Sequence, residues 1–193
     1  SHAMFDSTRG VNKIIYPNVD LAEGTDGNGN IESFDSNGFT VGGNQQYANH
    51  ASATQCTWAW RAGGGSGNRT TFSESGNNPA GGYQANTTAG FSIVDYTGTG
   101  SAGTIAHGLG AVPHFGVLFT YSATTYGTVY HHQWSSSPFS NYSLLTSSGA
   151  VQASSNIWGS AKPTSTLWTG LVGSLFSAGQ TYMFYSWTGI EGY

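Results

Sequence analysis

Charged side chains are almost absent from the second half of this 193-residue chain. Between Ser101 and Tyr193 only Lys162 and Glu191 are charged, and 7% of the whole sequence is charged against the usual quarter. The strong helix formers that cover an exposed helix face, such as Lys and Glu, are therefore scarce. Aromatic residues make up 14%, separated by Gly, Ser, Thr and Asn, as is typical of strands and tight turns. The composition predicts an all-β protein, and its aromatic content argues against disorder.

Seven short runs of strand-forming residues follow one another after residue 88. Such strands, separated by turn residues, are the signature of an antiparallel β-sandwich, of jelly-roll or immunoglobulin-like type. Between two of them, the turn His107-Gly108-Leu109-Gly110 is expected to hold its glycines at positive φ, with His107 bonded to the loop backbone. The expected strands are Phe91–Tyr96, Gly103–Ile105, His114–Tyr121, Gly127–Trp134, Tyr142–Thr146, Thr166–Trp168 and Gln180–Trp187.

Composition also divides the chain into regions. Residues 1–4 resemble a cloning scar, 5–62 an N-terminal β segment, 63–87 a Gly/Asn-rich linker or excursion, and 88–193 the sandwich module. A loose repeat supports this division, because a short strand and a long aromatic strand recur in the same order. We therefore expect 5–62 to resemble half of a repeated module. The repeat relates Phe39–Gly42 and Cys56–Trp60 to Leu167–Gly170 and Met183–Trp187.

The cysteine and the tryptophans are sorted by their local pattern. Cys56 lies in an alternating apolar stretch and is expected to be a small buried hydrophobe. Two tryptophans, Trp134 and Trp158, flank loops and are candidates for the surface. The other four lie on strand-like segments and are expected in the core: Trp58, Trp60, Trp168 and Trp187.

One cluster stands out as a candidate ligand site, the run from Tyr130 to Trp134. His131 and His132 are adjacent on a strand and face opposite ways, so they cannot easily bind one metal ion together. An exposed aromatic ring with neutral hydrogen-bonding neighbours suits a sugar instead. Ordinary core and interface packing is the alternative. The candidate ligand-binding residues are Tyr130, His131, His132, Trp134 and Trp158.

Several function classes are disfavoured. A net charge of −4 argues against nucleic-acid binding, which needs clustered cations. No apolar run is long enough for a membrane span. Beyond residue 88 the only acids are Asp95 and Glu191, and no nucleophile elbow, phosphate loop or Cys/His metal cluster is present. We therefore expect no enzyme activity, no metal and no cofactor.

Several stretches resemble, in order, segments of predicted tail-fibre and tail proteins of marine bacteriophages. The sequence departs from that pattern at His114, where a Lys is usual, and between Tyr121 and Ser143. The resemblance implies a β-sandwich in a virion tail fibre, extracellular on release, and assembled with other copies of itself, commonly as a homotrimer. The resembling stretches are Phe5–Gly10, Ser33–Thr40, Trp58–Gly64, Gly90–Gly100, Thr104–Pro113, Pro163–Leu167, Tyr182–Trp187 and Glu191–Tyr193.

Sequence and resemblance together predict a structural or adhesive module of a tail fibre that binds a host cell-surface glycan or receptor. Two alternatives stay open at this point. One is a polysaccharide-degrading tail enzyme, and the other is a capsid decoration protein without a receptor.

Overall fold

The computed structural model describes residues 2–25, 27, 30–43, 47–63, 68–146, 149–159 and 161–191. Within these ranges the fold is all-β, with one large antiparallel sheet and smaller two-stranded sheets. The large sheet has eight strands, in the order β12 (Gln152–Ala153), β11 (Asn141–Leu144), β10 (Thr128–His131), β9 (Phe115–Thr120), β14 (Thr181–Trp187), β7 (Phe91–Thr97), β6 (Gly81–Asn86) and β5 (Thr70–Phe72).

The smaller sheets are two-stranded ribbons. They pair β8 (Gly103–Ala106) with β13 (Leu167–Leu171), β1 (Lys13–Ile14) with β2 (Gly24–Thr25), and β3 (Ile31–Asp35) with β4 (Gly38–Val41). Two single-turn 3-10 helices are η2 (Pro138–Ser140) and η3 (Gly173–Leu175). The prediction of an all-β sandwich is confirmed, and the structure adds that its layers are unequal in size.

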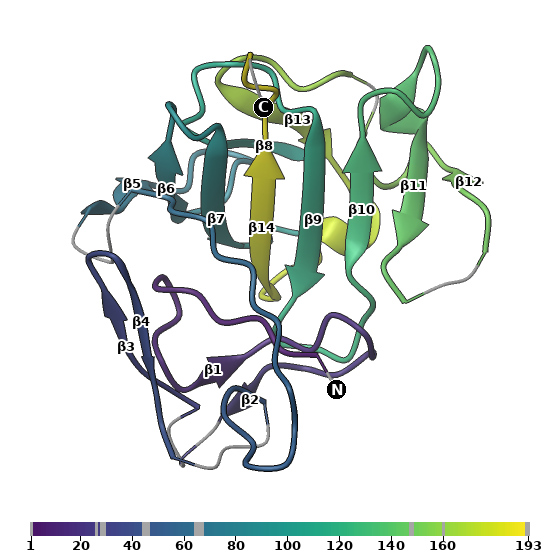
Figure 1. Ribbon diagram of the computed structural model, residues 1–193. Coiled ribbons are helices and arrows are strands. Elements are labelled where there is room, and N and C mark those ends of the chain that lie inside the picture. Colours follow the sequence, from purple (N-terminus) through teal and green to yellow (C-terminus); the bar gives the residue numbers. More distant parts are fainter. Residues whose placement is uncertain are drawn as a thin grey trace.

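The inner face of the large sheet packs against the β8–β13 ribbon, which lies behind the sheet in Figure 1. Alternate residues of the central strands supply this face, since successive side chains of a strand point to opposite sides. Trp168 of β13 lies over it and donates its indole N–H to Ser186 Oγ at 3.1 Å. The buried residues of this core are Val94, Tyr96, Ile105, Leu118, Tyr130, Trp158, Trp168, Leu171, Leu175, Phe176, Tyr182 and Phe184.

The outer face carries the other alternate residues and packs against the N-terminal segment. Ile15 and Ala62 from that segment are buried against the sheet. The chain that leads to β5 crosses in front of β7 and β14 (Figure 1). Because β7 and β14 are covered on both faces, they carry near-continuous apolar runs. The sheet residues of this second core are Phe91, Ile93, Val117, Phe119, Val129, Met183 and Tyr185.

The stretch 63–87, expected to be a linker or excursion, contains two strands where the structure describes it. Residues 70–86, expected in a linker, contribute β5 and β6 to the large sheet. Residues 64–67 of that stretch lie outside the described residues. Residues 56–60, expected as a strand in the repeat, have an extended course without strand pairing. Met4, Ile15 and Ala62 of the N-terminal segment pack on the outer face of the same sandwich.

That unpaired segment also overturns three burial predictions. Cys56 is exposed. Trp58 is 73% exposed and Trp60 is 56% exposed, although both were expected in the core. With no neighbouring strand and no second layer above it, the segment buries little of either side. Trp168 is buried as predicted, and Trp187 is partly buried at the end of β14.

The turn that contains His107 has the expected conformation. Gly108 and Gly110 have φ values of 69° and 71°. His107 is fully buried, its Nδ1 accepts the Leu109 N–H at 3.2 Å, and its Nε2 lies 3.1 Å from the Thr164 carbonyl oxygen. The ring is therefore held as a neutral tautomer that donates from Nε2.

Candidate functional site

Four rings on the outer face lie in one line across the large sheet, at the end where β14 finishes. The register pairs Trp187 with Phe91 of β7 on one side and with Phe115 of β9 on the other. Phe115 is paired in turn with His131 of β10. Directly opposed residues of antiparallel strands point to the same face, and adjacent strands lie about 4.8 Å apart. Strand pairing alone therefore places these rings side by side.

Two more rings contact this line, Trp134 at its β10 end and Trp60 against the Trp187–Phe91 pair at its β7 end. Trp134, which follows β10, has its ring centroid 6.1 Å from that of His131. Trp60 lies 5.6 Å from Trp187 and also contacts Phe91, which is buried. Between these ends, the His131–Phe115 and Phe115–Trp187 separations are 6.3 and 5.3 Å. We term the five rings that retain exposed surface the aromatic row: Trp134, His131, Phe115, Trp187 and Trp60.

A histidine cluster flanks the row at the β10 end. His114 and His132 stack in parallel, with centroids 4.0 Å apart and an interplanar angle of 6°. His132 lies 5.2 Å from His131. Burial lowers the pKa of His132, and the neighbouring His114 and His131 lower it further. His132 is therefore neutral at pH 7, since its ordinary pKa of about 6.5 is already below that pH.

Two of these imidazoles use one ring nitrogen for local backbone contacts. His131 Nδ1 accepts the Gln133 N–H at 3.2 Å, and His114 Nδ1 accepts the Gly189 N–H at 3.1 Å. These bonds fix the rings and direct Nε2 of each away from the bonded backbone. The remaining imidazole nitrogens beside apolar rings give this end of the row hydrogen-bonding capacity.

Three of the predicted site residues are brought together here. His131 and Trp134 belong to the row, and His132 lies beside it. All three are partly exposed. The structure therefore groups them as neighbours on the outer face.

The remaining two predicted residues lie on the opposite side of the sheet. Tyr130 and Trp158 are each 1% exposed, and their rings meet edge to face in the inner core at 5.7 Å. Burial raises the pKa of Tyr130 to about 12. Tyr130 precedes His131 on β10 and so points to the other face, and Trp158 packs inward against Trp168 and Phe184. Their prediction as surface ligand contacts is wrong.

Sequence reasoning missed three members of the row: Phe115, Trp187 and Trp60. Phe115 begins one expected strand and Trp187 ends another, and antiparallel neighbours meet start to end. That signal could have indicated a shared sheet end. Trp60 comes from an unpaired segment, and no local pattern places it on the sheet.

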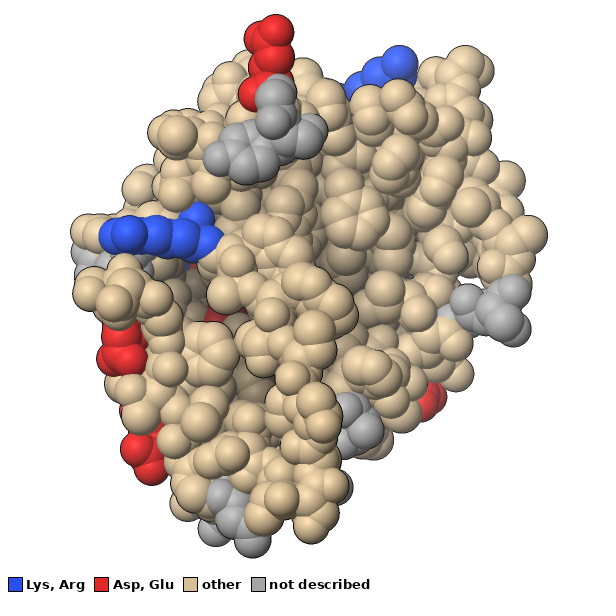
Figure 2. Space-filling view, in the orientation of Figure 1, with Lys and Arg blue, Asp and Glu red and all other residues tan. Residues whose placement is uncertain are grey.

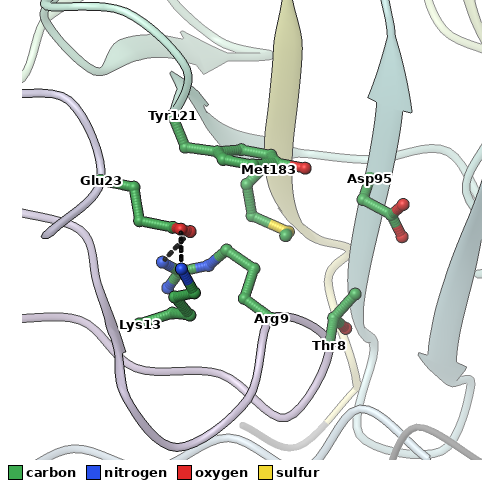
Figure 3. Close-up of a pocket in the computed structure, with 7 residues that line it drawn as sticks. All are labelled: Thr8, Arg9, Lys13, Glu23, Asp95, Tyr121 and Met183. Atoms are coloured by element: carbon green, nitrogen blue, oxygen red, sulfur yellow. Dashed lines mark hydrogen bonds and ion pairs between the residues drawn. The ribbon is translucent and has the colours of Figure 1, made fainter. Parts of the chain in front are cut away.

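A separate cavity of about 180 Å³ lies at the seam between the N-terminal segment and the sheet. Figure 3 shows Glu23 between Arg9 and Lys13, with Asp95 on the opposite wall. Glu23 forms ion pairs with Arg9 at 3.2 Å and Lys13 at 3.1 Å. Asp95 is held by both the Nε and Nη2 of Arg69, at 2.7 and 2.5 Å. Each carboxylate of this cavity is therefore engaged by cations of the fold.

Beside the cavity, a buried polar network ties the N-terminal segment to β14. Asp6 accepts a hydrogen bond from the Tyr185 hydroxyl at 2.7 Å and pairs with Arg9 Nε at 2.6 Å. Burial, together with the Asp6 charge, raises the pKa of Tyr185 well above its usual value. Burial alone would lower the pKa of Arg9. The interactions of Arg9 with Tyr185, Asp6 and Glu23 outweigh the effect of burial and raise its pKa. Tyr185 therefore donates to Asp6 as a neutral phenol, while Arg9 is paired with both Asp6 and Glu23.

The aromatic row itself is uncharged, although the exposed Arg61 follows Trp60 in the sequence. Figure 2 shows tan residues over β9 and β10, with charged side chains mainly toward the margins of the view. No Lys, Arg, Asp or Glu belongs to the row. In the described part of the chain, no group of three or more His, Cys, Asp or Glu side chains could hold a metal ion. Among the same residues, no helix is long and apolar enough to cross a membrane.

Fold and surface together describe a β-sandwich module with an open line of rings on one face. The chain belongs to the family described as a domain of unknown function, DUF7483, which it matches over residues 1–193. No curated protein and no solved structure matches it.

Proposed function

We propose that this protein is an adhesive module of a bacteriophage tail fibre that binds a neutral surface glycan of the host through the aromatic row. The observation that carries the glycan assignment is the line of five rings with exposed surface, flanked by the stacked imidazoles of His114 and His132. The fibre assignment rests on the sequence resemblance to phage tail proteins.

The chemistry of the row favours a sugar over other ligands. The apolar face of a sugar stacks on an aromatic ring while its hydroxyls bond to neutral donors and acceptors around it. Nucleic acid would need cations along the row to neutralise its phosphates, and the row has none. A ligand with many hydroxyls and no charge fits both the apolar rings and the hydrogen-bonding imidazoles of this surface.

A binding role without catalysis agrees with the state of the acidic groups at the cavity. Glycoside hydrolysis needs one carboxyl group that donates a proton and a second one that acts as nucleophile or base. Glu23 and Asp95 are both held in ion pairs with cations of the fold, and neither belongs to the aromatic row. We therefore propose that host glycan leaves the protein with its length unchanged.

Adhesion would gain strength from the number of modules in a fibre. A shallow line of rings makes weak individual contacts, but linked copies raise the effective concentration at the surface. Overall avidity then exceeds the affinity of one module by about 10²- to 10⁴-fold. Homotrimeric assembly, implied by the resemblance, would supply such copies.

The test is a binding assay of the protein on host cells and on their purified surface polysaccharide. We expect binding that is lost in Trp134→Ala and retained in Trp58→Ala, a matched exposed tryptophan outside the row. Absence of binding to either material would overturn the adhesive proposal. Shortening of the polysaccharide during incubation, measured by size-exclusion chromatography, would overturn the non-catalytic part.

A further inference from the structure

The shape of the aromatic row constrains which part of a glycan it can hold, provided that the proposed function is correct. Its members come from three neighbouring strands, β14, β9 and β10, and from the segments at its two ends. The line therefore runs perpendicular to the strands. Both end rings have exposed surface, and Trp60 is 56% exposed. Among the described residues, this exposure of the end rings is compatible with a sugar chain that continues past the row at both ends.

The spacing of the rings is regular. Successive ring centroids from Trp134 to Trp60 are separated by 6.1, 6.3, 5.3 and 5.6 Å. A single sugar covers about one aromatic ring, so one monosaccharide would leave most of the row in water. A chain of several sugars would cover all five rings at once.

The two ends of the row differ in chemistry. The β10 end has imidazoles with hydrogen-bonding capacity, whereas the other end consists of Phe115, Trp187 and Trp60. Ring stacking is therefore available along the whole line, and directional hydrogen bonding is concentrated at one end. Such a gradient favours one direction of a bound chain over the other.

We propose that the row binds an internal stretch of an extended neutral polysaccharide laid across β14, β9 and β10, in contact with several consecutive sugars. Trp60 is the residue that lengthens this stretch at the β7 end, where its exposed ring packs against both Trp187 and Phe91.

The test uses neutral gluco-, manno-, galacto- and xylo-oligosaccharides, from monosaccharide to heptasaccharide, titrated by calorimetry. We expect affinity for the recognised series to rise about tenfold or more between disaccharide and pentasaccharide, and then to level off. Trp60→Ala should reduce affinity for the longest members and leave the shortest unchanged. Trp58→Ala, from the same segment, should alter neither.

Two negative outcomes are distinguishable. Monosaccharide binding as tight as heptasaccharide binding would overturn the internal-stretch proposal and leave the glycan function intact. Absence of binding across all four series, with folded protein confirmed by its near-ultraviolet circular dichroism, would overturn the neutral-glycan function itself.

Discussion

The two faces of the large sheet are made from the same strands and have opposite relations to solvent. The inner face is dry, with Trp158, Trp168 and Phe184 packed against one another at centroid distances of 4.5 to 5.8 Å. The outer face is covered by the N-terminal segment over part of its area and open along the aromatic row. Aromatic residues are abundant on both sides, so aromatic content alone does not separate core from binding surface.

Adjacent residues on β10 show what separates them. Tyr130 and His131 are sequence neighbours, yet one lies in the inner core and the other in the row. The face of the strand on which a side chain lies determines whether it points to the inner core or to the outer face. The segments that pack over that face determine how much of the side chain is exposed. We therefore expect substitutions on the inner face to affect stability and substitutions in the row to affect binding.

The largest expected effect is on the inner face. Trp168→Ala would leave a cavity under β13 and remove the bond to Ser186 Oγ, so the free energy of unfolding should fall by about 3–5 kcal/mol. Urea denaturation measures this loss. Trp58→Ala on the exposed segment should change it by no more than about 0.5 kcal/mol. Equal losses in the two variants would contradict the assignment of a packed inner face and an open outer one.

The next effect concerns the part of the outer face that is covered. Asp6→Asn would leave the buried guanidinium of Arg9 without its closest anion and weaken the contact with Tyr185. Loss of one partner of a buried ion pair costs about 3–5 kcal/mol, and thermal unfolding should show it. Asp35→Asn in the exposed β3–β4 hairpin is the matched control, with an expected change within about 0.5 kcal/mol.

A smaller expected effect is a pH dependence of stability that arises from the buried His107. Burial lowers the pKa of His107, despite the opposing hydrogen bond to the Thr164 carbonyl. The unfolded chain therefore binds a proton near its ordinary pKa of about 6.5, before the folded protein does. The stability that the neutral, buried His107 contributes is fully present above pH 6.5. It decreases as the pH falls toward the pKa of His107 in the folded protein.

Denaturation midpoints measured at successive pH values test this slope. His107→Gln should flatten it, because the proton uptake of the unfolded chain is removed. His50→Gln, at an exposed position, should leave it unchanged. A wild-type midpoint that stays constant between pH 7 and pH 5 would contradict the neutral buried state of His107.

The smallest effect should appear in binding alone. Acidification would place positive charge on His132, which stacks on His114 and is neutral at pH 7 because burial, His114 and His131 lower its pKa. Affinity for a neutral glycan should therefore decrease modestly below pH 6.5, while the glycan itself does not titrate. His132→Asn should remove most of this dependence in the same calorimetric titration. An unchanged pH dependence of affinity in that variant would show that the histidine cluster does not contribute to binding at the row.

The strands after residue 88 were predictable because local alternation and turn residues specify them. All seven expected runs have a counterpart in β7 to β11, β13 and β14. The strands at 70–86 were missed because their glycines were interpreted as flexibility. Gly82 is instead favoured by packing, since a Cβ there would lie 2.7 Å from the Thr70 backbone carbonyl oxygen on the neighbouring strand.

The cover over each face could not be predicted from local pattern. The bond between Asp6 and Tyr185 joins residues 179 positions apart. Trp158, in a loop, turns inward under β13, whereas Trp60, in a strand-like run, stays exposed for lack of a paired strand. His131, His132 and Trp134 could be predicted because they lie close together in the sequence. Phe115 and Trp187 could not, because only the register across strands places them in the same line.

The most direct test is hydroxyl-radical footprinting of the six tryptophans with and without purified host surface polysaccharide. We predict that bound polysaccharide protects Trp60, Trp134 and Trp187 from oxidation. Trp58 should be strongly oxidised with or without polysaccharide, and Trp158 and Trp168 should be unreactive in both states. Protection of Trp58 alone, or equal reactivity of Trp158 and Trp134 in the free protein, would contradict the account of one dry face and one binding face.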